Sequence, residues 1–267
     1  MNPIAVLPVL GAAFAVSALL FAALWLVSIR LRDPSFVDAW WALGVAPLVW
    51  VTWAFLDRPD MHAHLIALLA SAWSLRLGLY LLARWRAHGP DRRYQKLAQR
   101  AQEKHGMNFA TFAALWVFGP QLLLQFVMAL PAMLGQMSWD RPLGPLAYAG
   151  AALAVFGILY QAVADEQLTA FKRDPANAGK VMDRGLWRYS RHPNYFGELC
   201  TWWGIFAVAL ETPLGLWSLP GPLLITFLLT RVSGAPTTEP HLQRTRPDYA
   251  AYKARTSAFI PMPPKAS

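Results

Sequence analysis

The chain contains little charge and almost no cysteine. Charged residues make up 15% of its 267 positions and hydrophobic residues 56%, whereas a soluble domain of this length would carry about 25% charged residues. The one cysteine, Cys200, excludes a disulfide framework, a cysteine-based metal site and a redox pair. The six histidines are scattered without ligand spacing, which argues against a zinc site. We therefore expect an integral membrane protein with no bound metal.

The common nucleotide and nucleophile motifs are also missing. The chain has no Gly-x-Ser-x-Gly elbow, no P-loop and no Gly-x-Gly-x-x-Gly fingerprint. Arginine and lysine would therefore have to grip the phosphates of any nucleotide cofactor, outside a Rossmann fold. The net charge of +9 would suit nucleic acid, but membrane topology explains it better. We expect no nucleic-acid partner.

Seven apolar stretches are long enough, or nearly so, to cross a hydrocarbon core of about 30 Å. The first has neither a basic n-region nor a small-residue cleavage site, so we expect a retained span and not a signal peptide. The sequence thus predicts an all-α, polytopic membrane bundle of about seven transmembrane helices, forming a single integral-membrane domain over residues 1–267. The spans are expected near 4–29, 35–56, 62–83, 110–134, 144–165, 194–210 and 214–231.

The loop cations indicate how these spans are oriented. Of the 24 lysines and arginines, 21 lie on the side reached after the first, third, fifth and seventh spans. Cationic loops remain in the cytoplasm. We therefore expect the N-terminus outside and the C-terminus inside, in a bacterial-type inner (plasma) membrane. A water-soluble cofactor would bind from the cytoplasm, and the apolar body would accept a lipid-like substrate among the membrane lipids.

Ionisable residues within predicted spans are costly and often functional, and Arg76 and Asp38 are two of them. Arg76 lies eight residues, about 12 Å, inside the third span from its basic end at Arg84. Asp38 lies about one turn into the second span, on the same side. Antiparallel spans can bring the two together, either as a structural pair or as part of a site. Gln121 and Gln125, one turn apart, are typical of polar contacts between helices.

The stretch from Gly185 to Glu198 is more polar than an anchor requires. Pro193 suits the first turn of a helix. A helix that starts there would place four residues on one face at the membrane surface: Arg191, Asn194, Tyr195 and Glu198. An anchor needs only Arg, Tyr and Trp, so the Asn and the Glu predict a ligand.

A second polar stripe lies at the inner end of the fifth span. Gln161, Asp165 and Lys172 recur close to one line along a helix. A solvated helix end, or contact of Lys172 with anionic lipid, is the alternative to a binding role.

Four segments of the chain resemble steroid 5-alpha-reductase-like membrane proteins, most closely their bacterial branch. They are Asp33–Trp41, Trp73–Leu77, Asp183–Glu198 and Tyr252–Pro261, and the Arg-His-Pro-Asn-Tyr-Phe-Gly-Glu sequence at 191–198 is the most specific. The resemblance implies a seven-span bundle that binds NADPH from the cytoplasm and reduces a carbon–carbon double bond, often in a sterol-like substrate. It places the cofactor-binding half at residues 110–267.

The same resemblance assigns roles to individual residues. Asn194 and Glu198 would hold the nicotinamide, while Asp165 and Lys172 would contact the ribose and phosphates. The full set implied for cofactor binding is Gln161, Asp165, Lys172, Arg184, Tyr189, Arg191, His192, Asn194, Tyr195 and Glu198.

The substrate half departs from the family pattern. Steroid reductases place a Gln-Glu pair just before Pro-Ser-Phe and a tyrosine in the third span. Here Leu31 and Arg32 stand ahead of Asp33-Pro34-Ser35-Phe36, and Trp73 occupies the tyrosine position. Three residues remain as catalytic candidates: Asp38, Arg76 and Tyr80.

Two other functions compete with reduction. The Arg-His-Pro step followed by an aromatic residue and glycine also resembles membrane methyltransferases that use S-adenosylmethionine on isoprenylcysteine or phospholipid, although that resemblance covers only the last hundred residues or so. A transporter or lipid-binding scaffold is the third possibility, but transporters often contain repeats, and the chain shows none.

Overall fold

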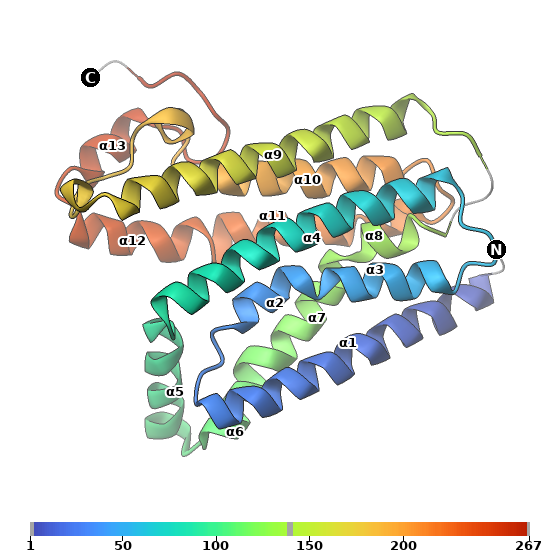
Figure 1. Cartoon of the computed structure of the whole chain (residues 1–267), viewed down its shortest axis with the longest axis horizontal. Helices are drawn as coiled ribbons and strands as arrows, with labels where there is room; N and C mark the ends of the chain where they lie inside the picture. Colours follow the sequence, from blue (N-terminus) through green and yellow to red (C-terminus); the bar gives the residue numbers. More distant parts are fainter. Residues whose placement is uncertain (1–2, 138–140, 266–267) are drawn as a thin grey trace.

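The helices of the protein run side by side in an elongated bundle (Figure 1). The computed structural model describes residues 3–137 and 141–265. Within those two ranges there is no β-strand, only an isolated bridge between Ser190 and Ser257. The predicted all-α membrane architecture is confirmed.

Six segments are long and apolar enough to cross a membrane, and they match six of the predicted spans. The seventh is α10 (Pro193–Ala209), a 17-residue helix that lies along its neighbour in the bundle (Figure 1). The six are formed by α1 (Pro3–Leu31); α2 (Val37–Leu43) with α3 (Val45–Ala54); α4 (Met61–His88); α6 (Phe109–Phe112) with π-helical η1 (Ala113–Phe118) and α7 (Gly119–Met128); α9 (Pro145–Arg173); and η4 (Gly215–Ser218) with α11 (Pro220–Phe227), η5 (Leu228–Val232) and α12 (Ala235–Thr245).

The hydrophilic segments gather at one end of the bundle, which we call the basic end (left in Figure 1). It contains α5 (Arg92–His105), the segment 174–192 with its short helices η2 (Pro175–Asn177) and η3 (Gly185–Arg188), and α13 (Tyr249–Arg255). The start of α1 lies at the opposite end (Figure 1), which agrees with an odd number of passes. The side of the membrane on which each end lies stays a prediction.

A buried amide joins two of the broken spans. Gln125 of α7 is fully buried and donates through Nε2 to the carbonyl oxygens of Trp40 (3.0 Å) and Trp41 (2.9 Å). The contact occurs beside Gly44, which separates α2 from α3; a Cβ there would lie 2.6 Å from Gln125 Nε2. The predicted role of Gln125 as an interhelical contact is confirmed. After α7, the short helix α8 (Leu130–Leu134) completes this part of the chain.

A glycine contact holds α9 against α10. A Cβ on Gly157 would lie 2.5 Å from the carbonyl oxygen of Gly197, and one on Gly204 would lie 2.5 Å from the backbone nitrogen of Ala154. Small residues at such positions let two helix backbones touch. The buried rings of Trp73 and Trp202, with centroids 4.9 Å apart, join α4 to the same unit. Together α4, α9 and α10 form the frame on which the site is built.

At the end opposite to the basic end, Glu211 ties three segments together. Its carboxylate accepts the backbone N–H groups of Gly144 (2.8 Å) and Ala147 (3.0 Å) at the start of α9, and His62 Nε2 of α4 lies 3.1 Å away. Burial raises the pKa of Glu211, but these hydrogen bonds outweigh it and the net shift is downward. The ionised carboxylate therefore stabilises the folded state.

Candidate functional site

One carboxylate joins the three helices of the frame in the half nearest the basic end. Asp165 of α9 lies with Oδ2 2.5 Å from Nη2 of Arg76, on α4, and its Oδ1 accepts from Nδ2 of Asn194, on α10, at 3.2 Å. The exposed fractions are 5% for the Asp165 side chain and 19% for that of Arg76. The predicted pairing of Arg76 with Asp38 is wrong, because Arg76 is paired with Asp165.

A second polar pair lies one turn further from the basic end. Gln161 Nε2 donates to Glu198 Oε2 at 3.1 Å, and both residues are buried. Gln161 precedes Asp165 by four residues and Glu198 follows Asn194 by four, so the two pairs lie one above the other on antiparallel helices. The glycine contact brings the helices close enough for these side chains to meet. The two predicted polar stripes are thus brought together at Gln161, Asp165, Asn194 and Glu198.

Three atoms of this group, which we call the polar cluster (Arg76, Gln161, Asp165, Asn194 and Glu198), are buried without a partner among the described residues. They are Arg76 Nη1, Gln161 Oε1 and Asn194 Oδ1. Buried polar atoms in folded proteins nearly always have a hydrogen-bond partner. One donor and two acceptors therefore remain for a ligand or for water.

Tyr80 lies beside the polar cluster, one turn after Arg76 on α4. Its hydroxyl is 3.2 Å from Thr169 Oγ1 of α9, and the Arg76 guanidinium carbon lies 5.6 Å from the centre of its ring. Two of the three catalytic candidates, Arg76 and Tyr80, are therefore in contact.

The third candidate, Asp38, belongs to a different hydrogen-bonded group. Its Oδ1 accepts from the Tyr94 hydroxyl at 2.6 Å, and its Oδ2 lies 3.7 Å from Arg93 Nη2. Gln121 Nε2 donates to the same Tyr94 hydroxyl at 3.4 Å. Burial, and then the Asp38 carboxylate, hold the pKa of Tyr94 well above its usual range. Tyr94 therefore stays protonated and acts as the donor to Asp38.

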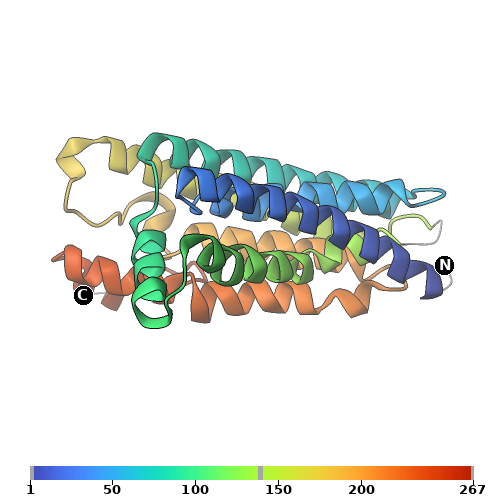
Figure 2. The same cartoon turned by 90° about the horizontal axis from the view of Figure 1, so that it is seen from below.

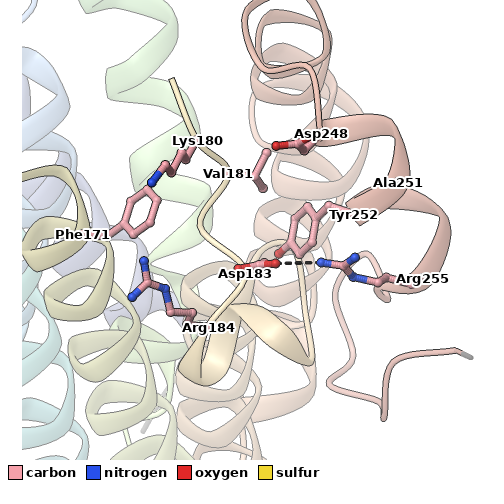
Figure 3. Close-up of a pocket in the computed structure, with 9 residues that line it drawn as sticks. All are labelled: Phe171, Lys180, Val181, Asp183, Arg184, Asp248, Ala251, Tyr252 and Arg255. Atoms are coloured by element: carbon pink, nitrogen blue, oxygen red, sulfur yellow. Dashed lines mark hydrogen bonds and ion pairs between the residues drawn. The ribbon is translucent and has the colours of Figure 1, made fainter. Parts of the chain in front are cut away.

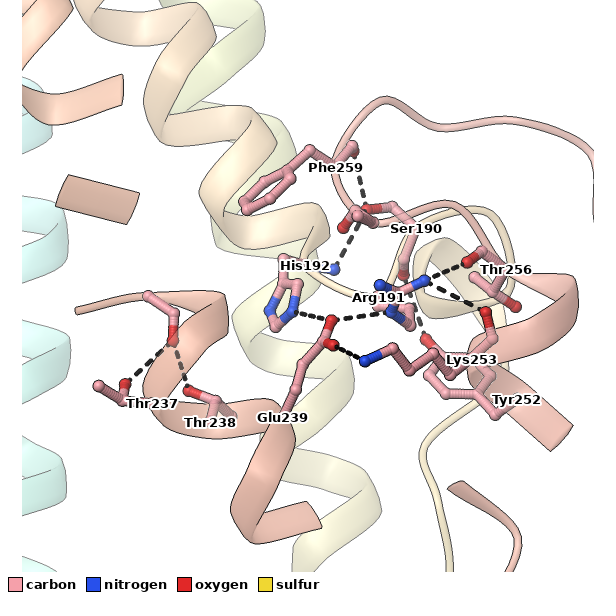
Figure 4. Close-up of polar contacts among 12 residues, drawn as sticks. Ser190, Arg191, His192, Thr237, Thr238, Glu239, Tyr252, Lys253, Thr256 and Phe259 are labelled. Atoms are coloured by element: carbon pink, nitrogen blue, oxygen red, sulfur yellow. Dashed lines mark hydrogen bonds and ion pairs between the residues drawn. The ribbon is translucent and has the colours of Figure 1, made fainter. Parts of the chain in front are cut away.

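At the basic end, the carboxylate of Glu239, on α12, contacts three cationic or hydrogen-bonding side chains (Figure 4). Arg191 Nε lies 2.9 Å and His192 Nε2 3.1 Å from its Oε1, and Lys253 Nζ lies 2.9 Å from its Oε2. Arg191 Nη1 also donates to the carbonyl oxygen of Thr256 at 2.6 Å. These contacts fasten the C-terminal segment to the loop before α10.

The position of Arg191 corrects one detail of the sequence interpretation. The helix α10 begins at Pro193, as predicted, but Arg191 lies before it and its side chain is directed to Glu239. It therefore does not share a helix face with Asn194 and Glu198. His192 stacks on the ring of Tyr195, with centroids 5.2 Å apart. Cofactor contacts of Arg191, His192 and Tyr195 stay predictions.

A cavity of about 360 Å³ lies at the basic end, close to the last turns of α9 (Figure 3). Lys180, Arg184 and Phe171 line it, and the Arg184 guanidinium carbon lies 5.5 Å from the centre of the Phe171 ring. Phe171 follows Asp165 by six residues, or about 9 Å along a helix. The cavity and the polar cluster are therefore linked by one stretch of α9.

Two other predicted residues lie at the surface of the basic end. Lys172 is exposed on the last turn of α9, and Tyr189 is 42% exposed beyond η3. Neither forms a side-chain hydrogen bond or ion pair with the residues that the structure describes.

Sequence reasoning missed the residue that organises the basic end. Glu239 is the one Asp or Glu between residues 212 and 247, a stretch that also contains Arg231, Arg244 and Arg246. A single acid among several cations is the sequence signal that could have predicted an ion pair shared by more than one cation. The glycines were missed too, although Gly150 and Gly157, like Gly197 and Gly204, are seven residues apart.

Comparison with known proteins gave one match. Residues 24–256 fit the family model described as "Protein of unknown function (DUF1295)". No curated protein and no solved structure matched the chain. The matched range includes the polar cluster, the cavity and the Glu239 contacts.

Proposed function

The chain belongs to the DUF1295 family, and we propose that it is a membrane-embedded reductase that uses NADPH to reduce a carbon–carbon double bond in a lipid-like substrate. Within the family we assign it to the steroid 5-alpha-reductase-like proteins, on the resemblance of residues 183–198. A sterol or another apolar enone is the proposed substrate class. The basic end would face the cytoplasm, where the loop cations place it.

The three unpartnered atoms of the polar cluster support this proposal most. A nicotinamide carries a carboxamide, which offers one carbonyl acceptor and an NH₂ donor. Arg76 Nη1 is a free donor, and Asn194 Oδ1 and Gln161 Oε1 are free acceptors. The cluster therefore has the complement of a carboxamide in a buried place, where an unmet hydrogen bond is costly.

The remaining contacts suit the other end of the same cofactor. Lys180 and Arg184 line the cavity at the basic end, and Lys172 lies exposed on α9 directly after Phe171, which lines the same cavity. Lysine and arginine bind phosphate through charge, and arginine also through a two-pronged hydrogen bond. A dinucleotide would thus run along the last turns of α9.

The chain's own residues would position the cofactor and donate a proton to the substrate. Bound NADPH supplies the hydride. Asp165 holds Arg76 in place between α4 and α9, and Glu198 fixes the orientation of the Gln161 amide. The Tyr80 hydroxyl, which is hydrogen-bonded to Thr169 beside the Arg76 cation, is the O–H that we propose as the proton donor to a substrate. Asp38 lies in the separate Tyr94 group, so any role in turnover is independent of cofactor binding.

Ligand titration tests the proposal. NADPH should quench the tryptophan fluorescence of the purified protein, and Asn194→Ala or Glu198→Ala should weaken binding at least about tenfold through lost or misdirected hydrogen bonds. Gln99→Ala, an exposed amide on α5, is the matched control and should leave the affinity unchanged. Quenching by S-adenosylmethionine with no response to NADPH would replace reduction by methyl transfer.

A further inference from the structure

The helix α5 crosses the basic end at right angles to the spans (Figures 1 and 2). It lies just before α6, where the chain enters the bundle again, so its axis runs parallel to the plane of the membrane surface. Both of its ends are capped. The Asp91 carboxylate accepts from the Arg93 N–H at 2.8 Å, and Gly106 closes the last turn with a left-handed φ of 64°. It is therefore a defined helix at the level of the interface.

The two sides of α5 have opposite character. Tyr94, Ala98 and Ala101 pack on the aromatic core formed by α1, α2 and the α6–η1 segment. The other side carries four cations at intervals of four residues, all exposed: Arg92, Lys96, Arg100 and Lys104. None of the four forms an ion pair or a side-chain hydrogen bond with any described residue. We call them the cationic stripe.

The cationic stripe is unfavourable for the isolated helix. Residues four apart are neighbours on a helix surface, and like charges at that spacing repel. The stripe contains three such neighbouring pairs. Glu103 is the one acid on this side of α5 and forms no ion pair with any of the four cations, so it offsets only part of the repulsion. By contrast, Arg93 on the same helix is paired with Asp91 at 2.7 Å. An external anion would remove the repulsion.

We propose that the cationic stripe binds the headgroups of anionic phospholipids. The surroundings of α5 favour lipid over a soluble anion. His105, its last residue, stacks on Trp116 of η1, with ring centroids 6.1 Å apart, and Trp116 is 56% exposed. Exposed tryptophan on a span is typical of the membrane interface. Leu97, 46% exposed beside the stripe, adds an apolar contact of the kind that seats amphipathic helices on a bilayer.

The geometry also allows the side chains to reach the headgroups. Lysine and arginine extend their charge several atoms from the helix while their stems cover apolar surface. Arg32, at the end of α1, lies with its guanidinium carbon 6.0 Å from the ring centre of Phe109 and adds a further cation at this level. Basic segments next to a span attract anionic lipid in this way. The proposal does not depend on the chain being a reductase.

Lipid selectivity tests the proposal. The full-length protein is placed in vesicles of phosphatidylcholine and phosphatidylglycerol at roughly 3:1. The measurement compares the association of spin-labelled phosphatidylglycerol with that of spin-labelled phosphatidylcholine. Each interfacial cation favours the anionic lipid by roughly fivefold at most. The variant with Arg92, Lys96, Arg100 and Lys104 replaced by Gln should lose at least about fivefold of the wild-type selectivity. Salt at about 1 M should abolish the same difference, because the Debye length falls to about 3 Å.

A second set of four exposed cations provides the matched control. Replacement of Arg173, Arg188, Arg231 and Arg244 by Gln removes the same charge from the basic end without touching α5, and it should leave most of the selectivity. Equal loss in both variants would overturn the proposal in favour of a general charge effect. Inorganic phosphate that displaces spin-labelled phosphatidylglycerol at constant ionic strength would overturn it in favour of a soluble-anion site. The thermal unfolding midpoint of the α5 variant in pure phosphatidylcholine should not be lower than that of the wild type, because the repulsion between the four cations is relieved. A lower midpoint would reveal misfolding, independently of the lipid measurement.

Discussion

The Arg76–Asp165 pair should couple α4 to α9 energetically, and Asp165→Asn is the sharpest perturbation of it. The substitution keeps the size of the side chain but removes the charge that faces Arg76 Nη2 at 2.5 Å. Removing one partner of a buried pair costs about 3–5 kcal/mol. Since the Arg76 side chain is 19% exposed, water relieves part of this, and we expect a loss of about 2 kcal/mol in the free energy of unfolding.

A double-mutant cycle isolates the coupling. Arg76→Gln should also cost about 2 kcal/mol, because it leaves the buried Asp165 carboxylate without its ion-pair partner. In the double variant neither charge remains, so its loss should be close to that of one single variant, and the coupling should be about 2 kcal/mol. The measurement is thermal unfolding in detergent followed by tryptophan fluorescence, where each kcal/mol shifts the midpoint by about 2–4 °C.

Additive losses in the double variant would refute this reasoning. They would mean that the two side chains stabilise the fold separately and that the contact is incidental. The pair between Arg255 and Asp183 provides the control, since its N–O distance is 2.7 Å but its side chains are 40% and 39% exposed. Asp183→Asn should cost less than about 1 kcal/mol.

Three further substitutions test other parts of the structure. Gly157→Leu should lower stability by about 3 kcal/mol or more in thermal unfolding, because the added side chain meets the α10 backbone. Gly11→Ala, inside α1 and with no atom within 4 Å of the added Cβ, should not lower stability. Glu211→Gln should lower the unfolding midpoint at about pH 7 by the equivalent of roughly 1 kcal/mol. Because the folded pKa of Glu211 is lowered from 4.5, the difference should disappear as the pH falls below that value, and a constant difference would contradict the assignment. Asp38→Asn should reduce turnover more than NADPH affinity; full activity would make Asp38 structural.

The spans could be predicted from hydropathy, but their internal shape could not. The sixth predicted span, 194–210, agrees closely with α10, because Pro193 marks its first turn. The fifth was expected to end near 165, yet α9 continues to Arg173. Hydropathy reports where a chain leaves the bilayer, and a helix can continue into water. The π-helical turn at Ala113–Phe118 has no strong sequence signal, since it depends on packing in the bundle.

The members of the polar cluster could be predicted better than their pairing. Four-residue spacing predicted that Gln161 and Asp165 share one face of α9 and that Asn194 and Glu198 share one face of α10, and the structure brings the two faces together. The prediction that Arg76 pairs with Asp38 was wrong because α4 packs against both α2 and α9, and periodicity does not say which neighbour a residue faces. The depth of each residue within its span would have indicated which acid pairs with Arg76. Arg76 precedes Arg84 by eight residues and Asp165 precedes Arg173 by eight, whereas Asp38 lies about one turn inside its span.

The glycine contact explains why polar groups accumulate at this depth. Gly197 of α10 lies against both Gly157 and Gln161 of α9, and a Cβ on it would be 2.7 Å from the Gln161 backbone nitrogen. Backbones this close leave no room for large apolar side chains on the facing positions. The next residues toward the basic end therefore lie at the edges of the contact, where Asp165 and Asn194 reach each other and Arg76 reaches in from α4. A frame of this kind fixes the direction of each polar atom through rigid helices, which is the condition for recognising a flat amide by a few hydrogen bonds. Arg76 Nη1, Gln161 Oε1 and Asn194 Oδ1 have no hydrogen-bond partner among the described residues, and under the proposed function these are the atoms that a ligand would meet.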